Sequence, residues 1–431
     1  MSIEPASEER STPYTSAILV GVLAVTSVFG YGGPLGFVVP VALGGLLLAP
    51  VAARFRWPPV EWLILALLVA WAATTMLWSP AAPDRDVASY ADLEALTALK
   101  LALQLALYGL LVVGASKAST EGARRALWAM VALMVPWSVL LLADGISGGR
   151  AWVAITSLFG VETPRHLWEK KAGEGAYVLA VLAWPAIGFL LTRRRPALAV
   201  TILVAGTLGM AALSAWSGVA AVFAGLAAML LVGALGVVGG RVIGIGAATL
   251  TVAAPMLVAT AESGGLFAAV RDNLTASWAA RTRIWSFAAE RITEQPFRGW
   301  GLDASRTFGE AIPLHTHDAP LQLWLELGLP GVLLACAFWI VLGRRISRLT
   351  DARPAAGQFA AATAVAYFTV GALSFGVWQE WWLAVGALAF TACALAAKVR
   401  PSGATTLSDI EFRAAPNALS RQTLPEDLEA V

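Results

Sequence analysis

Charged residues are scarce in this chain. Only 13% of its 431 residues are Asp, Glu, Lys or Arg, and 58% are apolar. A soluble domain carries about a quarter charged residues, so the composition excludes a soluble enzyme. The 30 Lys and Arg residues nearly balance the 28 Asp and Glu residues. That balance excludes a nucleic-acid-binding protein that works through bulk positive charge.

Cysteine and histidine are rarer still. The two cysteines, Cys336 and Cys393, both lie in apolar runs. We therefore expect neither a disulfide framework nor a thiolate metal site. Three histidines are too few for a metal-rich centre, and we expect no metal and no cofactor.

What the chain has in abundance is long apolar runs, each about the length of a membrane-spanning helix. The expected spans are 15–30, 34–53, 60–78, 93–115, 123–143, 175–192, 196–213, 215–239, 242–260, 319–343, 357–375 and 379–397. The predicted fold class is an all-α polytopic membrane protein with about twelve transmembrane helices. Membrane lipids are then expected to surround it.

Basic residues between the runs predict the orientation. One set of short loops holds thirteen of them: Arg54, Arg56, Lys117, Arg124, Arg125, Arg193, Arg194, Arg195, Arg241, Arg344, Arg345, Arg348 and Arg353. The short loops of the opposite set hold almost only Arg85. Because cytoplasmic loops are enriched in Lys and Arg, we predict that the first set and both termini are cytoplasmic.

The two ends of the chain are polar. Residues 1–14 are expected to form a cytoplasmic tail, and residues 398–431 a disordered cytoplasmic tail. A transmembrane domain over 15–397 lies between them. A cleaved signal peptide begins with a basic stretch, whereas this chain begins with acidic and polar residues, so none is expected.

Two long loops fall on the side opposite the basic loops, at about 144–174 and 261–318. Connections of this length are usually functional or disordered. In the second loop, Trp278 and Trp285 belong to a helical repeat of apolar residues over about 277–294. We predict an amphipathic helix there that lies along the membrane surface.

The most reactive local pattern is His315-Thr316-His317-Asp318, just before the tenth run. A neutral imidazole can accept a proton from a hydroxyl nucleophile near neutral pH. The alternative is a structural pair at the start of a helix, because Asp318 is a suitable N-cap residue. Both interpretations remain open at this point.

The roles of other charged residues also remain open at this point. The two long loops hold ten basic and eleven acidic residues, so they form either an ordinary solvated face or a site where a few arginines converge on an anion. Arginine suits the second role because its planar fork binds phosphate bidentately. Lys100 in the fourth run is expected to reach the cytoplasmic surface. Glu326, two turns into the tenth run, needs a partner, and a loop arginine or histidine is the nearest candidate.

Three segments, in this order, carry a resemblance to a known family. They are Arg281-Thr-Arg-Ile-Trp285, Pro296-Phe-Arg-Gly-Trp-Gly301 and His315-Thr-His-Asp-Ala-Pro-Leu-Gln-Leu-Trp-Leu-Glu-Leu-Gly-Leu-Pro-Gly331. In order and spacing they resemble the O-antigen ligase and polymerase superfamily of bacterial envelope glycosyltransferases. The chain differs from the usual family pattern at two positions. After the second histidine it has Asp318 where the family usually has Asn. Near the start of the eighth run it has Ser214-Ala-Trp-Ser217-Gly218 where the family often has Ser-Arg-Ser.

The resemblance implies a metal-independent, inverting transferase with a GT-C-like fold and a large periplasmic loop between the ninth and tenth helices. Its donor would be a glycan on undecaprenyl diphosphate, presented at the periplasmic face of the bacterial inner membrane. An acceptor hydroxyl would attack the anomeric carbon, and the lipid diphosphate would leave. The acceptor would be lipid A-core or a growing glycan, and no nucleic acid is involved.

The resemblance also suggests roles for individual residues. Arg281, with Arg283 or Arg306, would clamp the leaving phosphate. Lys171 would add a phosphate contact from the first loop. His317 would orient or deprotonate the acceptor hydroxyl, with His315 or Asp318 fixing its tautomer. Asp318 and Glu326 complete the expected substrate-binding set.

Four functions fit these observations. Ligation of O-antigen to lipid A-core comes first, and polymerisation of O-antigen or exopolysaccharide on the lipid carrier is a close second. Transfer of an oligosaccharide to a protein hydroxyl is third. A transporter is the fourth, but it would place charges in the middle of several spans, whereas here nearly all charge lies in loops.

Overall fold

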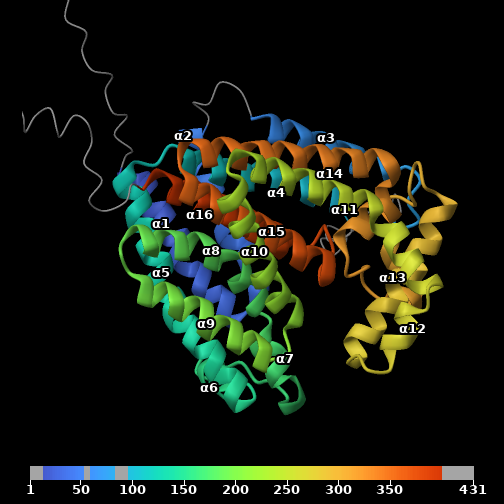
Figure 1. The fold of residues 1–431 in the computed structure, drawn as a ribbon, viewed down its shortest axis with the longest axis horizontal. Coiled ribbons are helices and arrows are strands. Elements are labelled where there is room, and N and C mark those ends of the chain that lie inside the picture. The colour runs from blue at the N-terminus through green and yellow to red at the C-terminus, as the bar shows by residue number, and fades with distance from the viewer. Residues whose placement is uncertain (1–12, 53–58, 83–95, 400–431) are drawn as a thin grey trace, which may run out of the picture.

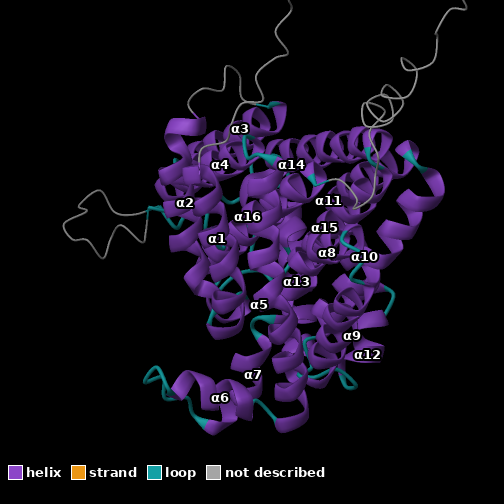
Figure 2. Ribbon diagram, turned by 90° about the vertical axis from the view of Figure 1, so that its left-hand side faces the viewer, coloured by secondary structure: helices purple, strands orange, loops and turns teal. Residues whose placement is uncertain are grey.

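A computed structural model of the chain describes residues 13–52, 59–82 and 96–399, and these residues form helices and no strand (Figures 1 and 2). Nine described helical segments are long and apolar enough to cross a membrane. They are α1 (Pro13–Gly32), α4 (Thr97–Ser116), α5 (Thr120–Ser147), the segment Arg165–Thr192 that ends in α8 (Ala176–Thr192), α10 (Trp216–Leu235), α11 (Val237–Ser263), α14 (Ala319–Ala352), α15 (Pro354–Leu373) and α16 (Glu380–Lys398). The predicted all-α membrane architecture is therefore confirmed.

Three further apolar helices are shorter, at 15 to 17 residues: α2 (Val38–Ala52), α3 (Val60–Thr75) and α9 (Pro196–Ala212). Together with the nine longer segments they coincide with the twelve predicted runs. That all twelve cross the membrane stays a prediction. Nearly all of the predicted tails, 1–14 and 398–431, and the loop arginines Arg54, Arg56 and Arg85 lie outside the described residues.

The two long loops are mostly helical. The first contains α6 (Arg150–Ser157) and α7 (Trp168–Gly173), and the second contains α12 (Leu266–Arg271) and α13 (Ala276–Glu294). The predicted helix over 277–294 is thus confirmed as α13. One face of α13 packs on α11 and on the start of α14, because Ile284, Ala288, Ala289 and Ile292 are buried against Val258, Leu321 and Leu325. This apolar face therefore rests on protein.

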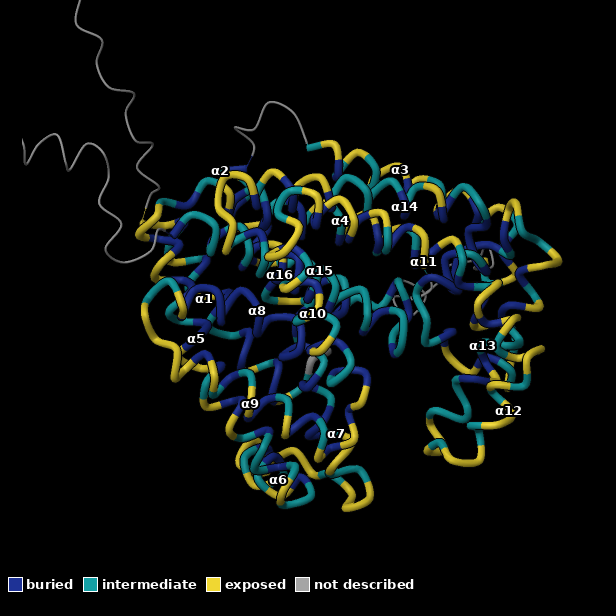
Figure 3. Tube along the Cα trace, in the orientation of Figure 1, coloured by how far each residue is buried: buried dark blue, intermediate teal, exposed yellow. Residues whose placement is uncertain are grey.

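The main core surrounds α8. Fourteen of its 17 residues are buried, so this helix has almost no face left for lipid. Around it lie α1, α5, α9, α10, α15 and α16, whose inward faces form the large buried region in Figure 3. A second cluster joins α3, α11 and α14, and in Figure 1 these three helices run side by side away from the α8 core.

A kink in α14 joins two of the sequence motifs. Gly328 has a non-helical backbone (φ +59°), and Pro330 has no N–H to bond the Glu326 carbonyl four residues earlier. The turn after α13 supplies the missing partners. Trp300 N donates to Leu325 O at 2.8 Å, and Gly301 N donates to Glu326 O at 2.8 Å. In return Leu329 N donates to Pro296 O at 3.0 Å, so the two segments complete each other's backbone hydrogen bonds.

Glycine is required where this turn meets the kink. Gly299 has φ +68°, and a Cβ there would lie 2.4 Å from Glu326 O. Gly299→Ala should therefore lower the free energy of unfolding by about 2–4 kcal/mol, through left-handed strain and steric overlap. The measurement is thermal unfolding of the purified chain in detergent.

Two matched glycines separate these causes. Gly309 has φ +57° but nothing within 4 Å of an added Cβ, and Gly246 has neither constraint. Gly309→Ala should cost only the backbone strain, about 1 kcal/mol, and Gly246→Ala should be neutral or slightly stabilising. Equal melting temperatures for the Gly299 and Gly246 variants would show that the turn does not need glycine.

Candidate functional site

Arg281 on α13 reaches the connection between α15 and α16. Its Nη1 donates to Leu373 O at 2.9 Å and to Ser374 Oγ at 3.4 Å. The guanidinium carbon lies 4.7 Å from the centre of the Trp278 ring, a cation–π contact one turn away on the same helix. The buried Nε has no hydrogen-bond partner in the part of the chain that the structure describes. Burial lowers the pKa of Arg281, but an arginine remains charged at neutral pH.

His317 reaches the same connection from the start of α14. Its backbone is left-handed (φ +55°), and its Nδ1 lies 2.8 Å from Ser374 O. A carbonyl oxygen only accepts, so Nδ1 carries the proton and the neutral ring keeps a free lone pair on Nε2. Burial, together with the nearby Arg281, lowers the pKa of His317. His317 is thus a neutral imidazole at pH 7 whose tautomer leaves Nε2 able to accept a proton.

His315 is hydrogen-bonded to the backbone of His317, and the two rings are close together. Its Nδ1 accepts the backbone N–H of His317 at 3.0 Å, and the two ring centres are 4.1 Å apart. The His315 Nε2 lies 2.9 Å from the side-chain amide of Gln379. Because Nδ1 is the acceptor, the neutral ring carries its proton on Nε2, and the Gln379 amide accepts that proton in its flipped orientation, in which Oε1 faces the ring and gains a donor that it otherwise lacks. Burial lowers the pKa of His315 to about 3, so this ring stays neutral. Both of its nitrogens are engaged in hydrogen bonds.

Asp318 is the N-cap of α14. Its Oδ1 accepts the Leu321 N–H at 2.8 Å. Burial raises the pKa of Asp318 to about 7. The atom that faces His317 Nδ1 is Ser374 O, not a group of His315 or Asp318, so a backbone carbonyl fixes the tautomer.

Three hydroxyl groups lie beside Arg281. Ser374 Oγ accepts from Arg281 and is hydrogen-bonded to Ser217 Oγ at the start of α10. Ser217 and Arg281 both lie within electrostatic range of the Tyr177 hydroxyl at the start of α8. No motif or spacing singled out Tyr177 or Ser374. Ser217 stood out only because an arginine is common at that place in the family that the chain resembles.

Glu326 is fully buried and does not pair with a loop arginine or histidine, so that expectation was wrong. Its Oε1 accepts from Gln322 Nε2 at 3.0 Å, and its Oε2 accepts from Trp378 Nε1 at 2.6 Å and from Asp303 N at 3.0 Å. Neutral N–H donors satisfy the carboxylate without a countercharge. Glu326 therefore links the turn after α13 to the α15–α16 connection through hydrogen bonds, and the histidines are not among its partners.

The other expected residues are placed less centrally. Arg306 is exposed and lies 3.5 Å from Asp303, yet close enough to His315 to affect that ring. Arg283 is exposed on α13 and has no interaction with the histidines among the described residues. Lys171 on α7 pairs with Glu174 at 2.8 Å, and Glu174 lies within electrostatic range of Tyr177.

Lys100 also has a partner. Its Nζ lies 2.8 Å from Glu380 Oε1, so it forms an ion pair between the starts of α4 and α16 instead of reaching the surface alone. This pair is half-exposed. It accounts for the one lysine that the sequence places inside an apolar run.

The site as a whole converges on the connection between α15 and α16, residues 374–379. Arg281 binds Leu373 O at the end of α15, His317 binds Ser374 O, His315 faces Gln379, and Gln322 Oε1 accepts the Val377 N–H at 2.9 Å. A strong cation and a neutral proton acceptor are therefore anchored on adjacent residues, Leu373 and Ser374. No group of three or more His, Cys, Asp or Glu side chains suited to a metal occurs in residues 13–52, 59–82 and 96–399.

Comparison with known proteins agrees with the motifs. Residues 178–336, which contain all three motif segments, match the family model described as O-antigen ligase. Three Rickettsia proteins, which carry the name polysaccharide ligase as an inferred assignment, are similar over part of the chain. The R. conorii protein is 33% identical over 124 residues, 26% of this chain and 30% of the relative, and the R. felis protein is 30% identical over the same shares. The R. bellii protein is 32% identical over 122 residues, 25% of this chain and 29% of the relative.

The matched part thus spans less than a third of these relatives, and no solved structure matches the chain. The family model and the relatives nevertheless point the same way. They confirm the resemblance predicted from the sequence: residues 178–336 are similar to the O-antigen ligase family.

Proposed function

We propose that this protein transfers a glycan from undecaprenyl diphosphate to an acceptor hydroxyl at the periplasmic face of the bacterial inner membrane. Ligation of polysaccharide to lipid A-core is the first candidate. The observation that carries the proposal is the shared anchoring of Arg281 and His317 on the Leu373–Ser374 backbone. Displacement at an anomeric carbon needs a base for the nucleophile and a cation for the leaving group, and this anchoring holds one of each.

His317 is the proposed general base. With Nδ1 bonded to Ser374 O, its Nε2 takes the proton as the acceptor oxygen bonds to the anomeric carbon. The bond from that carbon to the diphosphate oxygen breaks, and the electron pair leaves with the lipid diphosphate. A single displacement of this kind inverts the anomeric carbon.

Arg281 is the proposed phosphate ligand. Nη1 is held by Leu373 O, which leaves the rest of the guanidinium fork for an anion. The hydroxyl groups of Tyr177 and Ser217 extend the polar surface beside it. Arg306 and Lys171 are proposed as outer contacts, and Arg283, which points away on an exposed face, is a weaker candidate.

The membrane arrangement belongs to the same proposal. Twelve crossings of a GT-C-like fold would place both termini and the basic loops in the cytoplasm and α13 on the periplasmic side. The polyprenyl tail would then lie in the bilayer along α11, where Val252, Met256 and Leu257 are exposed apolar side chains near the end that leads to α12 and α13. Exposed apolar residues on a spanning helix face lipid.

Deleting the gene tests the function. Lipopolysaccharide and lipid-linked polymer are separated on gels from the deletion strain and from the strain complemented with wild type. Loss of long polymer from lipid A-core, with lipid-linked polymer accumulating, identifies a ligase. Core bearing a single repeat identifies a polymerase, which is the second candidate because both reactions need the same base and cation. Unchanged glycans in the deletion strain contradict both.

The proposed chemistry needs no divalent ion, because His317 and Arg281 supply the base and the cation. Transfer by the purified protein should therefore keep its full rate in excess EDTA. The assay follows polymer transfer from lipid-linked donor in detergent, with and without chelator. A large loss that Mg²⁺ or Mn²⁺ restores would assign part of the catalysis to a metal.

A further inference from the structure

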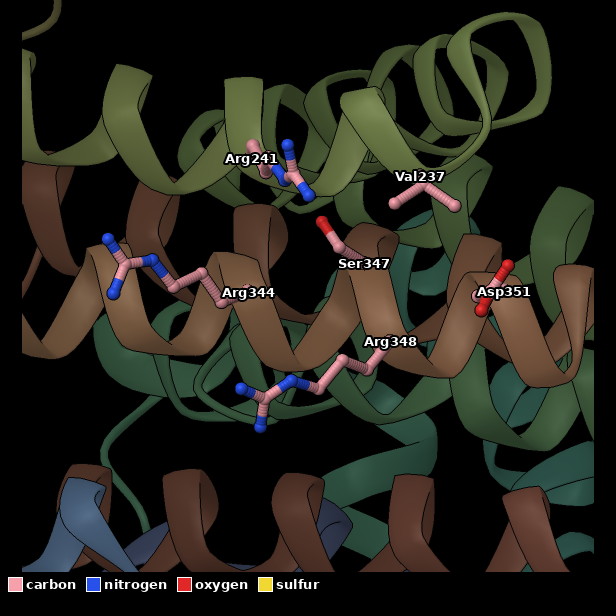
Figure 4. Close-up of a pocket in the computed structure, with 6 residues that line it drawn as sticks. All are labelled: Val237, Arg241, Arg344, Ser347, Arg348 and Asp351. Carbon is pink, nitrogen blue, oxygen red and sulfur yellow. The ribbon is translucent and has the colours of Figure 1, made fainter.

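A second polar feature lies at the far end of α11 and α14 from the histidines. A cavity of about 440 Å³ opens where the start of α11 crosses the second half of α14. Figure 4 shows Arg241 reaching from α11 toward Ser347, Arg344 and Arg348 extending from α14 around the same space, and Asp351 at the other end. The proposed transfer reaction uses none of these residues.

Close packing of the two helices creates this arrangement. A Cβ on Gly240 would lie 2.7 Å from Ser347, a Cβ on Gly244 would lie 2.7 Å from Trp339 O, and a Cβ on Gly343 would lie 2.6 Å from Gly240 O. Small residues let helix backbones touch in this way. As a consequence the long side chains next to them, Arg241 from one helix and Arg344 and Arg348 from the other, border one space.

The three arginines have no protein partner in the part of the chain that the structure describes. Within the described residues none of their guanidinium groups has a hydrogen bond or an ion pair, and all three are exposed. Their neighbour Arg345 differs, because both oxygens of the Glu61 carboxylate accept from it. The cavity lining thus has three cations and one acid, Asp351, and an anion would balance the excess charge.

The surroundings indicate which anion fits. Beyond the kink, from Leu329 to Asp351, the helix rises by about 33 Å, close to the thickness of the hydrocarbon core of a bilayer. The cavity is therefore at the membrane surface opposite the histidines. Beside Arg241 on α11, the apolar side chains of Val238, Val242 and Ile245 are 53%, 41% and 56% exposed. Cations next to an exposed apolar stripe match an anionic amphiphile better than a free ion.

We propose that this cavity binds the phosphate headgroup of an anionic phospholipid, with Arg241, Arg344 and Arg348 around the phosphate. The acyl chains lie along the stripe of Val238, Val242 and Ile245. This inference does not depend on the glycosyl-transfer proposal, since it concerns the other end of the molecule.

The test measures lipid binding to the purified full chain by native mass spectrometry, with phosphatidylglycerol, phosphatidylcholine and inorganic phosphate as probes. The variant R241Q/R344Q/R348Q removes the three cations. The matched control R194Q/R195Q/R353Q removes the same charge from exposed arginines outside the cavity. Melting temperatures without added lipid check folding, and the double variant R344Q/R348Q serves if the triple variant does not fold.

Wild type and the control should bind phosphatidylglycerol at least about tenfold more tightly than phosphatidylcholine. The cavity variant should lose that preference, and millimolar inorganic phosphate should not displace the lipid. Unchanged preference in the cavity variants overturns the proposal. So does an equal loss in the control, which would mean attraction by bulk charge, and displacement by phosphate, which would mean a soluble anion.

Discussion

Arg281→Ala should abolish glycan transfer, with kcat/KM falling by about 10³-fold. Among the described residues, this guanidinium is the one cation that is both half-buried beside the histidines and anchored through Leu373 O, and the proposal assigns its Nη2 donors to the leaving phosphate. Charge developing on a leaving phosphate would lose its fixed counterion in the variant. The measurement is polymer transfer from lipid-linked donor by purified protein, alongside gels of complemented deletion strains.

Two variants control this result. Arg281→Lys keeps the charge but loses the fork, so it should recover only a small part of the rate. Arg298→Ala removes an exposed arginine whose Nε contacts Gln295, and it should transfer at the wild-type rate. Because Arg281 also holds the α15–α16 connection, melting temperatures are compared for all three variants. A folded Arg281→Ala protein that transfers normally would end the phosphate-ligand assignment.

His317→Asn should slow transfer by about 10²–10⁴-fold, the usual range for loss of a general base. Asparagine suits this position for two reasons. It tolerates the left-handed backbone (φ +55°), and its amide N–H can replace the Nδ1–H donor to Ser374 O. The variant should therefore melt near the wild-type temperature while lacking a proton acceptor. His166→Asn, at the exposed third histidine, is the matched control and should keep the wild-type rate.

The pH profile separates a base from a structural histidine. A general base works unprotonated, and the pKa of His317 lies below its usual value of 6.5. Protonation therefore disables it only in more acidic solution, so the acid limb of kcat/KM that is due to His317 should have its midpoint below about pH 6.5. His317→Asn should lack this acid limb. If the variant matched wild type in rate and profile, the histidine pair would revert to a structural role at the start of α14.

The sequence predicts the helices well because a membrane helix is identified by local composition alone. It also predicts α13, since the repeat that includes Trp278 and Trp285 is local to one helix. The segments that carry Arg281 and His317 were found by their order and spacing. Their shared anchor was not, because Leu373 O and Ser374 O are backbone atoms 92 and 57 residues away. Because every residue has a carbonyl oxygen, the sequence does not indicate which carbonyls bind Arg281 and His317.

The hydrogen-bond partners of Glu326 also could not be predicted from the sequence. A buried carboxylate predicts a partner, and charge suggests arginine or histidine. The structure instead supplies the indole of Trp378, the amide of Gln322 and the backbone of Asp303. The Asp303 backbone belongs to the turn that is hydrogen-bonded to α14 at the kink at Gly328, and the helical pattern of α14 does not reveal this kink.

The anchoring of the candidate site on main-chain atoms has a consequence for genetics. In a saturation screen that exchanges one side chain at a time, Leu373 would score as tolerant, because every substitution except proline preserves a similar backbone. Inserting or deleting a single residue in the last turn of α15, before Leu373, would instead shift the carbonyls that Arg281 and His317 bind. A screen of insertions and deletions would therefore detect this anchor, whereas a screen of substitutions at Leu373 would not.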